Sequence, residues 1–210
     1  AMNDVAKALG LEQAPLRIEC YDISNTVGGA FQVAPMVAFE DAIAKKSEYR
    51  RFAIRGADGQ GALDDLSALY ETLTRRFQHG NIAGDSGESM DNERRASEHG
   101  DQTHEPTVQQ NTNRHHFAYK PNLVVVDGGK PQVMAAAKAL EDCGVDDVAV
   151  CGLAKRLEEV WVPDDDYPII LKRQSEGMYL LQRVRDESHR FAITYHRQQR
   201  RKGALRSALD

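Results

Sequence analysis

The first part of the chain alternates between apolar blocks and polar gaps, which predicts three strands and then a helix. Residues 16–24, 30–40 and 48–55 have the β-branched and aromatic content of strands. Pro35 lies inside the second of these segments, and because proline cannot donate to a strand ladder we expect an edge strand or a bulge there. Residues 63–77 carry apolar side chains in steps of three and four, which predicts an amphipathic helix.

The last part of the chain resumes the pattern with an uninterrupted β-branched run. Residues 123–126 read Leu-Val-Val-Val, which is typical of a strand buried on both faces. This run ends at Asp127, before two glycines, and a helix with Pro131 in its first turn follows to about residue 143. The pattern then predicts three short strands and a long final helix, at residues 147–153, 159–162, 169–171 and 177–200.

The order of these elements predicts the fold class. Three consecutive strands followed by strand–helix–strand units imply an α/β protein, with a mixed sheet and helices on both of its faces. The length of 210 residues is sufficient for one sizeable core.

A polar segment interrupts the pattern at residues 78–120. Its 43 residues have almost no apolar content and no periodicity, so they cannot bury enough surface to offset the entropy cost of ordering. Five of the seven histidines of the chain lie in this segment, and histidine-rich tracts can bind metal ions. Because these histidines lack the spacing of metal ligands, we favour a mobile, solvated insertion over a metal site.

The composition excludes several classes of protein. The chain has no run of 18 apolar residues, so no transmembrane helix is expected. Three cysteines without a CxxC pair argue against a disulfide scaffold, and the first residues lack the features of a signal peptide. We therefore expect a cytoplasmic location.

The net charge of −5 conceals an uneven distribution along the chain. Residues 183–210 hold eight basic and three acidic residues, a net charge of +5, whereas the first 182 residues carry −10. A negative total therefore does not exclude a nucleic-acid partner, because the C-terminal segment can contact phosphates. With this balance, any nucleic-acid binding by the chain alone is expected to be weak and salt-sensitive.

Two aspartates follow predicted strands, where α/β sheets commonly bind ligands. Asp22 lies near the end of the otherwise apolar first strand, and Asp127 directly follows the Leu-Val-Val-Val run. Each has a simpler interpretation, since Asp22 can begin a turn and Asp127 can cap the turn before a helix. If the two strands are neighbours, the carboxylates lie about 5 Å apart and repel each other unless a cation lies between them. Mg²⁺ or Mn²⁺ suits such oxygen ligands and assists phosphodiester hydrolysis.

The final helix supplies two candidate histidines. His189 and His196 lie together at the border of its buried stripe, seven residues or about 10 Å apart, so one metal ion can take only one of them. The pattern does not choose between the two. The alternative for each is a partly exposed helix histidine without a function.

Basic residues near the predicted strand ends and along the final helix suit contacts with nucleic-acid phosphates. Solvated surface charge is the alternative for each of them. The expected DNA-binding residues are Lys130, Lys155, Arg156, Arg185, Arg190, Arg197, Arg200 and Arg201.

Several motifs taken together resemble one known family. The segments RIECYDISNT, EYRRFAI, NLVVVDGGKPQ, GLAKR and LLQRVRDESHRFAITYHRQQR occur in this order. They resemble the C-terminal endonuclease domain of UvrC, the excision nuclease subunit of bacterial nucleotide excision repair. The resemblance covers residues 14–202 apart from the insertion.

This resemblance implies a fold, a site and a reaction. The implied fold is RNase H-like, a mixed five-stranded sheet of three antiparallel and then parallel strands with helices on both faces. The implied catalytic set is Asp22, Asp127 and His189 with Mg²⁺ or Mn²⁺, and the RDESH motif thereby selects His189 over His196. The implied reaction is the incision 5′ to a lesion in damaged double-stranded DNA, with UvrB as a partner and UvrA upstream. We expect a monomer without a membrane partner.

A further aspartate is linked to activity in this family, and here it is Asp65. Its assignment is the weakest, because Leu63 and Leu66 replace the glycine and tyrosine that are common around the Asp64-Asp65 pair. Asp64 or Asp65 is also the expected N-cap of the predicted helix. Asn25 stands where the family usually has histidine.

The resemblance also divides the chain. Residues 1–13 are expected to form an N-terminal helix or linker, residues 14–202 the endonuclease domain, and residues 203–210 the beginning of a link to a helix-hairpin-helix module. Whether His189 is a metal ligand or a proton-transfer group stays open. Two rival functions also stay open: an RNase H-like module that binds DNA or a partner without cutting, and a small-molecule phosphohydrolase.

Overall fold

The computed structural model describes residues 1–25, 32–56, 64–78, 119–156 and 159–209. Most of the segment between the first two predicted strands and almost all of the predicted insertion lie outside these residues. Within the described parts of the chain, no helix is both long and apolar enough to cross a membrane.

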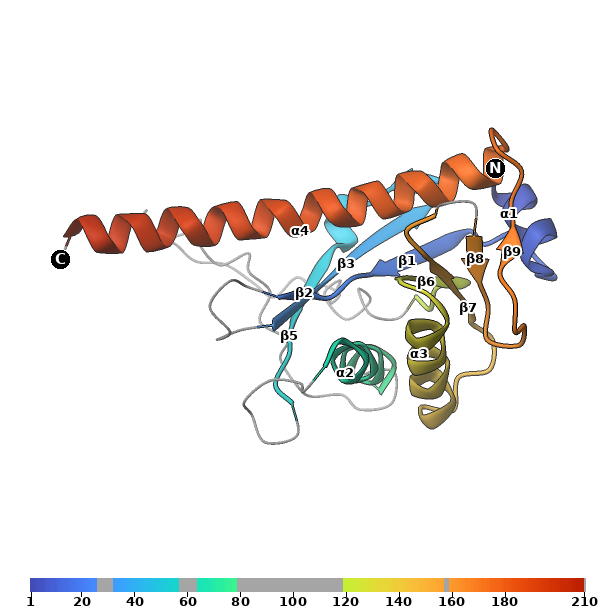
Figure 1. The fold of residues 1–210 in the computed structure, drawn as a ribbon, viewed down its shortest axis with the longest axis horizontal. Helices are drawn as coiled ribbons and strands as arrows, with labels where there is room; N and C mark the ends of the chain where they lie inside the picture. Colours follow the sequence, from blue (N-terminus) through green and yellow to red (C-terminus); the bar gives the residue numbers. More distant parts are fainter. Residues whose placement is uncertain (26–31, 57–63, 79–118, 157–158, 210) are drawn as a thin grey trace, which may run out of the picture.

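One mixed sheet forms the centre of the fold (Figure 1). Its longer strands are β1 (Arg17–Tyr21), β3 (Gln32–Glu40), β5 (Arg50–Ala53), β6 (Leu123–Asp127) and β7 (Ala149–Leu153). β1 pairs antiparallel with β3 and parallel with β6, and β6 pairs parallel with β7. β5 pairs antiparallel with the other side of β3. The predicted mixed sheet, antiparallel first and then parallel, is confirmed.

Four shorter strands extend the sheet. β2 (Ser24–Asn25) and β4 (Ile43–Ala44) pair antiparallel with β3. β8 (Glu159–Trp161) and β9 (Ile169–Ile170) continue the sheet beyond β7, also antiparallel. The described residues thus form a nine-stranded sheet, in which the five long strands correspond to the five-stranded sheet that the resemblance implies. β8 and β9 match two further strands predicted from the pattern, whereas β2 and β4 were not predicted as separate strands.

Helices cover both faces of the sheet, as predicted. α2 (Asp65–Gln78) and α3 (Lys130–Asp142) pack on one face, and α1 (Met2–Leu9) and α4 (Glu176–Leu209) pack on the other. A short 3-10 helix, η1 (Lys46–Glu48), precedes β5. Figure 1 shows α4 lying along the sheet and extending well past its strands.

β6 illustrates how the sheet separates two cores. Val124 and Val126 contact the core under α2 and α3, whereas Leu123 and Val125 contact the core under α4. All four side chains are fully buried. Successive residues of a strand point to opposite faces, so a strand covered on both sides must be apolar throughout.

The structure corrects two expectations. Pro35 marks neither an edge strand nor a bulge, because β3 lies between β1 and β5 there and keeps one register on both sides. The Pro35 carbonyl accepts a hydrogen bond from the Asp22 N–H (3.3 Å), but proline has no N–H to return one, so the ladder with β1 ends there. The final helix also continues past residue 200 to Leu209, because good helix formers such as Arg201 and Lys202 need no apolar face.

A buried ionic cluster connects α2 to β1. The Glu19 side chain is fully buried and accepts hydrogen bonds from Arg17 Nε (3.0 Å), Arg76 Nη2 (3.0 Å) and the Tyr21 hydroxyl (2.6 Å). Arg76 also donates to the Tyr119 carbonyl (2.9 Å). The cluster therefore holds α2, β1 and the segment before β6 together.

Candidate metal centre

Asp22 and Asp127 lie at the carboxyl ends of two neighbouring parallel strands. The register of β1 and β6 pairs Tyr21 with Val126, so the next residue of each strand is one of the two aspartates. The Oδ1 atom of Asp22 accepts a hydrogen bond from the Ile23 N–H (2.7 Å). The expectation that the two aspartate-bearing strands are neighbours is confirmed.

His189 reaches this pair from α4. Its Nε2 lies 2.9 Å from Oδ2 of Asp127. One possible ligand atom from each of Asp22, Asp127 and His189 lies within 4.8 Å of the others. The second candidate, His196, lies outside this cluster, and its ring contacts that of Tyr195.

The electrostatics of the pair match its geometry. Burial, and then the neighbouring carboxylate of Asp127, raises the pKa of Asp22 from its ordinary value of 3.8 to about 6. The Ile23 N–H and the His189 side chain oppose this shift. Asp22 therefore stays ionised at neutral pH at a cost in free energy, which a bound cation would offset.

Two glycines allow the backbones to approach closely beside Asp127. Gly128 has a φ of +150° and its N–H donates to the Leu153 carbonyl (3.0 Å). A Cβ at Gly152 would lie 2.5 Å from Val133 Cγ2 and 2.6 Å from the Gly128 carbonyl oxygen. These close approaches bring β6, α3 and β7 together at the carboxyl end of β6.

A pocket of about 530 Å³ adjoins the triad. Its lining comes from three places: the end of β6, the end of β7 and α4. The residues are Asp127, Gly128, Gly129, Leu153, Ala154, Lys155, Arg185 and His189. The Arg185 side chain is only 14% exposed, and its Nε lies 3.4 Å from Oδ1 of Asp127. Its Nη1 donates to the Ala154 carbonyl (3.0 Å). The pocket thus combines carboxylate, imidazole and cationic groups.

The residues present fit a hard divalent cation. Carboxylate oxygens are the ligands that Mg²⁺ and Mn²⁺ prefer, and an imidazole nitrogen is acceptable to Mn²⁺. Asp22 and Asp127 converge with His189, and the raised pKa of Asp22 indicates a site short of positive charge. A cation bound by these groups would relieve the repulsion between the two carboxylates.

Asp65 lies apart from the three converging groups. It is the first residue of α2 and is exposed. Asp64 is the N-cap, since its Oδ1 accepts the Ser67 N–H (2.7 Å). The charge of Asp65 is close enough to contribute to the raised pKa of Asp22. Its link to the site is therefore electrostatic in this structure.

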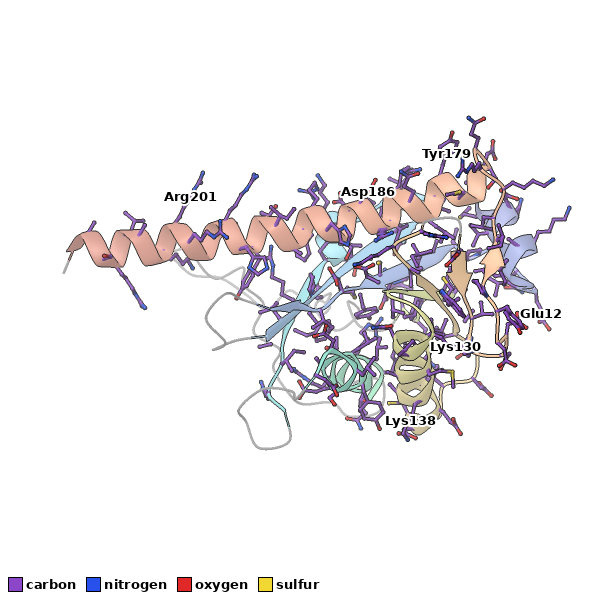
Figure 2. All side chains as sticks on the ribbon, in the orientation of Figure 1. Glu12, Lys130, Lys138, Tyr179, Asp186 and Arg201 are labelled. Atoms are coloured by element: carbon purple, nitrogen blue, oxygen red, sulfur yellow. The ribbon has the colours of Figure 1, made fainter. Side chains whose placement is uncertain are left out.

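The predicted phosphate-contacting residues fall into different situations. Lys130 is engaged, because its Nζ donates to the carbonyls of Val162 (2.9 Å), Pro163 (2.7 Å) and Asp165 (2.6 Å). All three of its donors are used in these contacts, so a phosphate contact by Lys130 would have to replace one of them. Figure 2 shows it at the beginning of α3.

The remaining basic residues differ in exposure. Arg190 makes an ion pair with Glu187 (Nε to Oε2, 2.9 Å). Lys155 and Arg156 are exposed just past β7. The three predicted DNA-contacting arginines on the C-terminal half of α4 are exposed, and Figure 2 labels the last of them: Arg197, Arg200 and Arg201.

Arg185 was grouped from the sequence with the expected DNA contacts. In the structure it lies largely covered, with its Nε beside Asp127. One signal was present, because Arg185 lies four residues before His189 and such residues share a helix face.

Known proteins resemble the chain along its length. The sequence profile described as the UvrC RNAse H endonuclease domain matches residues 6–193. The chain belongs to this family. A relative named UvrABC system protein C from Bifidobacterium longum is 75% identical over the whole chain, which covers 34% of that relative. Relatives of the same name from Beutenbergia cavernae and Thermobifida fusca are 54% and 56% identical, with 31% and 30% of their lengths covered.

The chain spans about a third of the length of these curated relatives. Among solved structures, the chain is similar to a Ciona intestinalis Endonuclease V in complex with DNA, with 13% identity and a TM-score of 0.38 over 82% of this chain and 56% of that one. The family membership confirms the resemblance drawn from the motifs and the RNase H-like α/β fold class.

Proposed function

We propose that the chain is a divalent-metal-dependent DNA endonuclease domain that makes the incision 5′ to a lesion in nucleotide excision repair. The observation that carries this proposal is the convergence of Asp22, Asp127 and His189 within 4.8 Å at the carboxyl ends of β1 and β6. Membership in a family of endonuclease domains supports the same reaction class.

Each group of the triad has a defined task in this proposal. Asp22 and Asp127 supply the oxygen ligands for Mg²⁺ or Mn²⁺, and His189 presents Nε2 to the same point. A divalent ion, when bound, activates a water molecule and neutralises charge on the phosphate. His189 serves as a ligand or accepts the proton of the attacking water, and its Nε2, 2.9 Å from Asp127, suits either task.

The substrate path follows the basic residues. Residues 190–209 of α4 include six arginines and lysines and no acidic residue. Arg197 and Arg201 lie about 12 and 18 Å along α4 from His189, on the part of the helix that extends past the sheet (Figure 1). Together with Lys155 and Arg156, this part of α4 is proposed to contact the phosphates of double-stranded DNA.

The partners are proposed from the relatives. They are named UvrABC system protein C, which supports UvrB as the direct partner and UvrA upstream. The chain covers about a third of these relatives, so other parts of such proteins are proposed to supply lesion targeting and most of the DNA affinity.

The proposal is tested by nicking of a lesion-containing duplex that carries a label on the damaged strand. The chain is expected to cut 5′ to the lesion with Mn²⁺ or Mg²⁺ and not with EDTA. Asp127→Asn is expected to abolish nicking, while Asp146→Asn, which neutralises an exposed aspartate outside the site, keeps it. Asp65→Asn is expected to lower the rate only partially, because it removes a negative charge near Asp22 that attracts the cation but removes no ligand.

Two results would reject this function. Nicking retained by a purified Asp127→Asn sample would remove the triad from the reaction. A chain that binds Mn²⁺ and DNA but cuts no duplex would instead support the rival function, that of an RNase H-like module that binds DNA without cutting it.

A further inference from the structure

Arg185 is a largely covered cation whose hydrogen-bonding capacity is not fully used. Its Nη1 is fixed on the Ala154 carbonyl at the end of β7 (3.0 Å). Its Nε is buried and lies 3.4 Å from Oδ1 of Asp127, but within the described residues it makes no hydrogen bond. A buried donor without a partner is uncommon and costs free energy, so it calls for a functional explanation.

The location of Arg185 is unfavourable for metal binding alone. Asp127 already contacts His189 through Oδ2 and Arg185 through Oδ1, so both of its oxygens face positive or potentially positive groups. A fixed positive charge beside a metal ligand repels a divalent cation. An arginine whose only purpose was to help this site hold a metal ion would therefore be badly placed.

The charge balance changes when a phosphodiester is included. Asp22 and Asp127 together carry two negative charges, which a divalent ion neutralises. The positive charge of Arg185 then remains to pair with the single negative charge of a phosphodiester. The 530 Å³ pocket that Arg185 lines together with Lys155 and His189 has room for such a group.

We propose that Arg185 binds the phosphodiester that is attacked, by donating to one of its non-bridging oxygens from the pocket beside Asp127. This inference rests on the proposed endonuclease function and gives Arg185, one of the expected DNA-contacting residues, a specific place at the phosphodiester that is cut. Arginine suits the task because its planar guanidinium matches phosphate oxygens and stays charged at every relevant pH. The negative charge on the phosphate oxygens grows during attack, so such a contact strengthens in the transition state.

The competing role for Arg185 is that of a brace that merely holds Asp127 in place. The two roles predict opposite changes in metal affinity. Removing a brace frees Asp127 to move and weakens metal binding. Removing a nearby positive charge, with Asp127 still placed by β6, strengthens metal binding.

The test is Arg185→Gln, measured first by calorimetric titration of the chain with Mn²⁺ in the absence of DNA. The Kd for Mn²⁺ is expected to fall about tenfold. The kcat for nicking of a duplex is expected to fall about 100-fold, the size of effect seen when one donor to a developing oxyanion is removed. Arg185→Lys, which keeps the charge, is expected to restore the wild-type Mn²⁺ affinity and part of kcat.

Arg183→Gln is the matched control. Arg183 lies on the same helix, is exposed and donates to the Ala42 carbonyl (2.7 Å), away from the triad. This variant removes one charge from α4 and is expected to leave Mn²⁺ affinity and kcat close to those of the wild type.

The outcomes separate the inference from the proposed function. A wild-type chain that nicks DNA, with an Arg185→Gln variant that binds Mn²⁺ more weakly, overturns the phosphate-binding role and leaves the endonuclease function intact. An Arg185→Gln variant with unchanged kcat does the same. A wild-type chain that neither binds Mn²⁺ nor nicks DNA overturns the proposed function and this inference together.

Discussion

The raised pKa of Asp22 makes a specific prediction about the stability of the metal-free chain. The pKa of Asp22 is about 6 in the folded state and has an ordinary value of 3.8. Above about pH 4 the unfolded state gains free energy by ionising this carboxyl, whereas the folded state ionises it only above about pH 6 and at a cost. The stability that depends on this group is therefore full below about pH 4 and is lost as the pH rises through about 6.

Asp22→Asn removes this cost, because the amide is neutral at every pH. Its carbonyl oxygen can still accept the Ile23 N–H that now bonds to Oδ1. The difference between 3.8 and about 6 corresponds to an upper bound of about 3 kcal/mol. Partial exposure of the site to water reduces this, so we expect the variant to be more stable by about 2 kcal/mol at pH 8 in EDTA, with little difference near pH 4.

The assay is urea unfolding, followed by circular dichroism, of the wild type and Asp22→Asn at several pH values from 4 to 8. Saturating Mn²⁺ should reverse the order at pH 8, because the wild type gains binding free energy in the folded state and the variant has lost a ligand. The same linkage predicts that Mn²⁺ affinity of the wild type weakens as the pH falls below about 6.

A variant that is less stable than the wild type at pH 8 in EDTA would refute the reasoning. So would a stability difference that stays constant from pH 4 to 8, because the argument depends on ionisation of Asp22. Asp146→Asn serves as the control, since an exposed aspartate outside the cluster should change stability little at any pH.

Three further predictions concern other parts of the fold. Glu19→Gln should cost about 3–5 kcal/mol in urea unfolding, because it removes the buried carboxylate that pairs with both Arg76 and Arg17, although Arg17 keeps its ion pair with Glu40, and a loss under 1 kcal/mol would contradict the buried cluster. Gly152→Ala should cost about 1–3 kcal/mol and weaken Mn²⁺ binding, because its Cβ would press on the Gly128 carbonyl beside Asp127; unchanged Mn²⁺ affinity would argue against this close approach. Replacing four basic residues of α4 by glutamine should reduce the slope of log K against log salt for duplex binding by about 3–4. The four are Arg197, Arg200, Arg201 and Lys202. Replacing four exposed lysines outside α4 by glutamine should leave that slope unchanged.

The pattern of apolar positions was sufficient to predict most of the elements. The Leu-Val-Val-Val run of β6 is apolar at every position, which predicts a strand buried on both faces of the sheet. In the structure Val124 and Val125 indeed lie in different cores. The amphipathic steps of α2 and α3 likewise predict one apolar face each. Boundaries were less predictable, since α4 continues to Leu209 without an apolar face to mark its end.

The candidate triad was visible in the sequence only as separate residues. Asp22 and Asp127 could be predicted as neighbours because both follow strands, but 105 positions separate them along the chain. Periodicity left His189 and His196 equivalent, and the family resemblance favoured His189. The path of α4 across the sheet brings His189 to 2.9 Å from Asp127, while His196 stays outside the cluster.

Local pattern thus determines which segments are strands and helices, because burial and backbone hydrogen bonding act over a few residues. Pairing, packing and charge environment depend on contacts between distant segments, and these decided the features that matter for chemistry. Pro35 lies between two strands rather than on an edge, and Lys130 is held by three carbonyls instead of facing a phosphate. Arg185, grouped from the sequence with the DNA-contacting residues, lies largely covered beside Asp127 and lines the pocket with it.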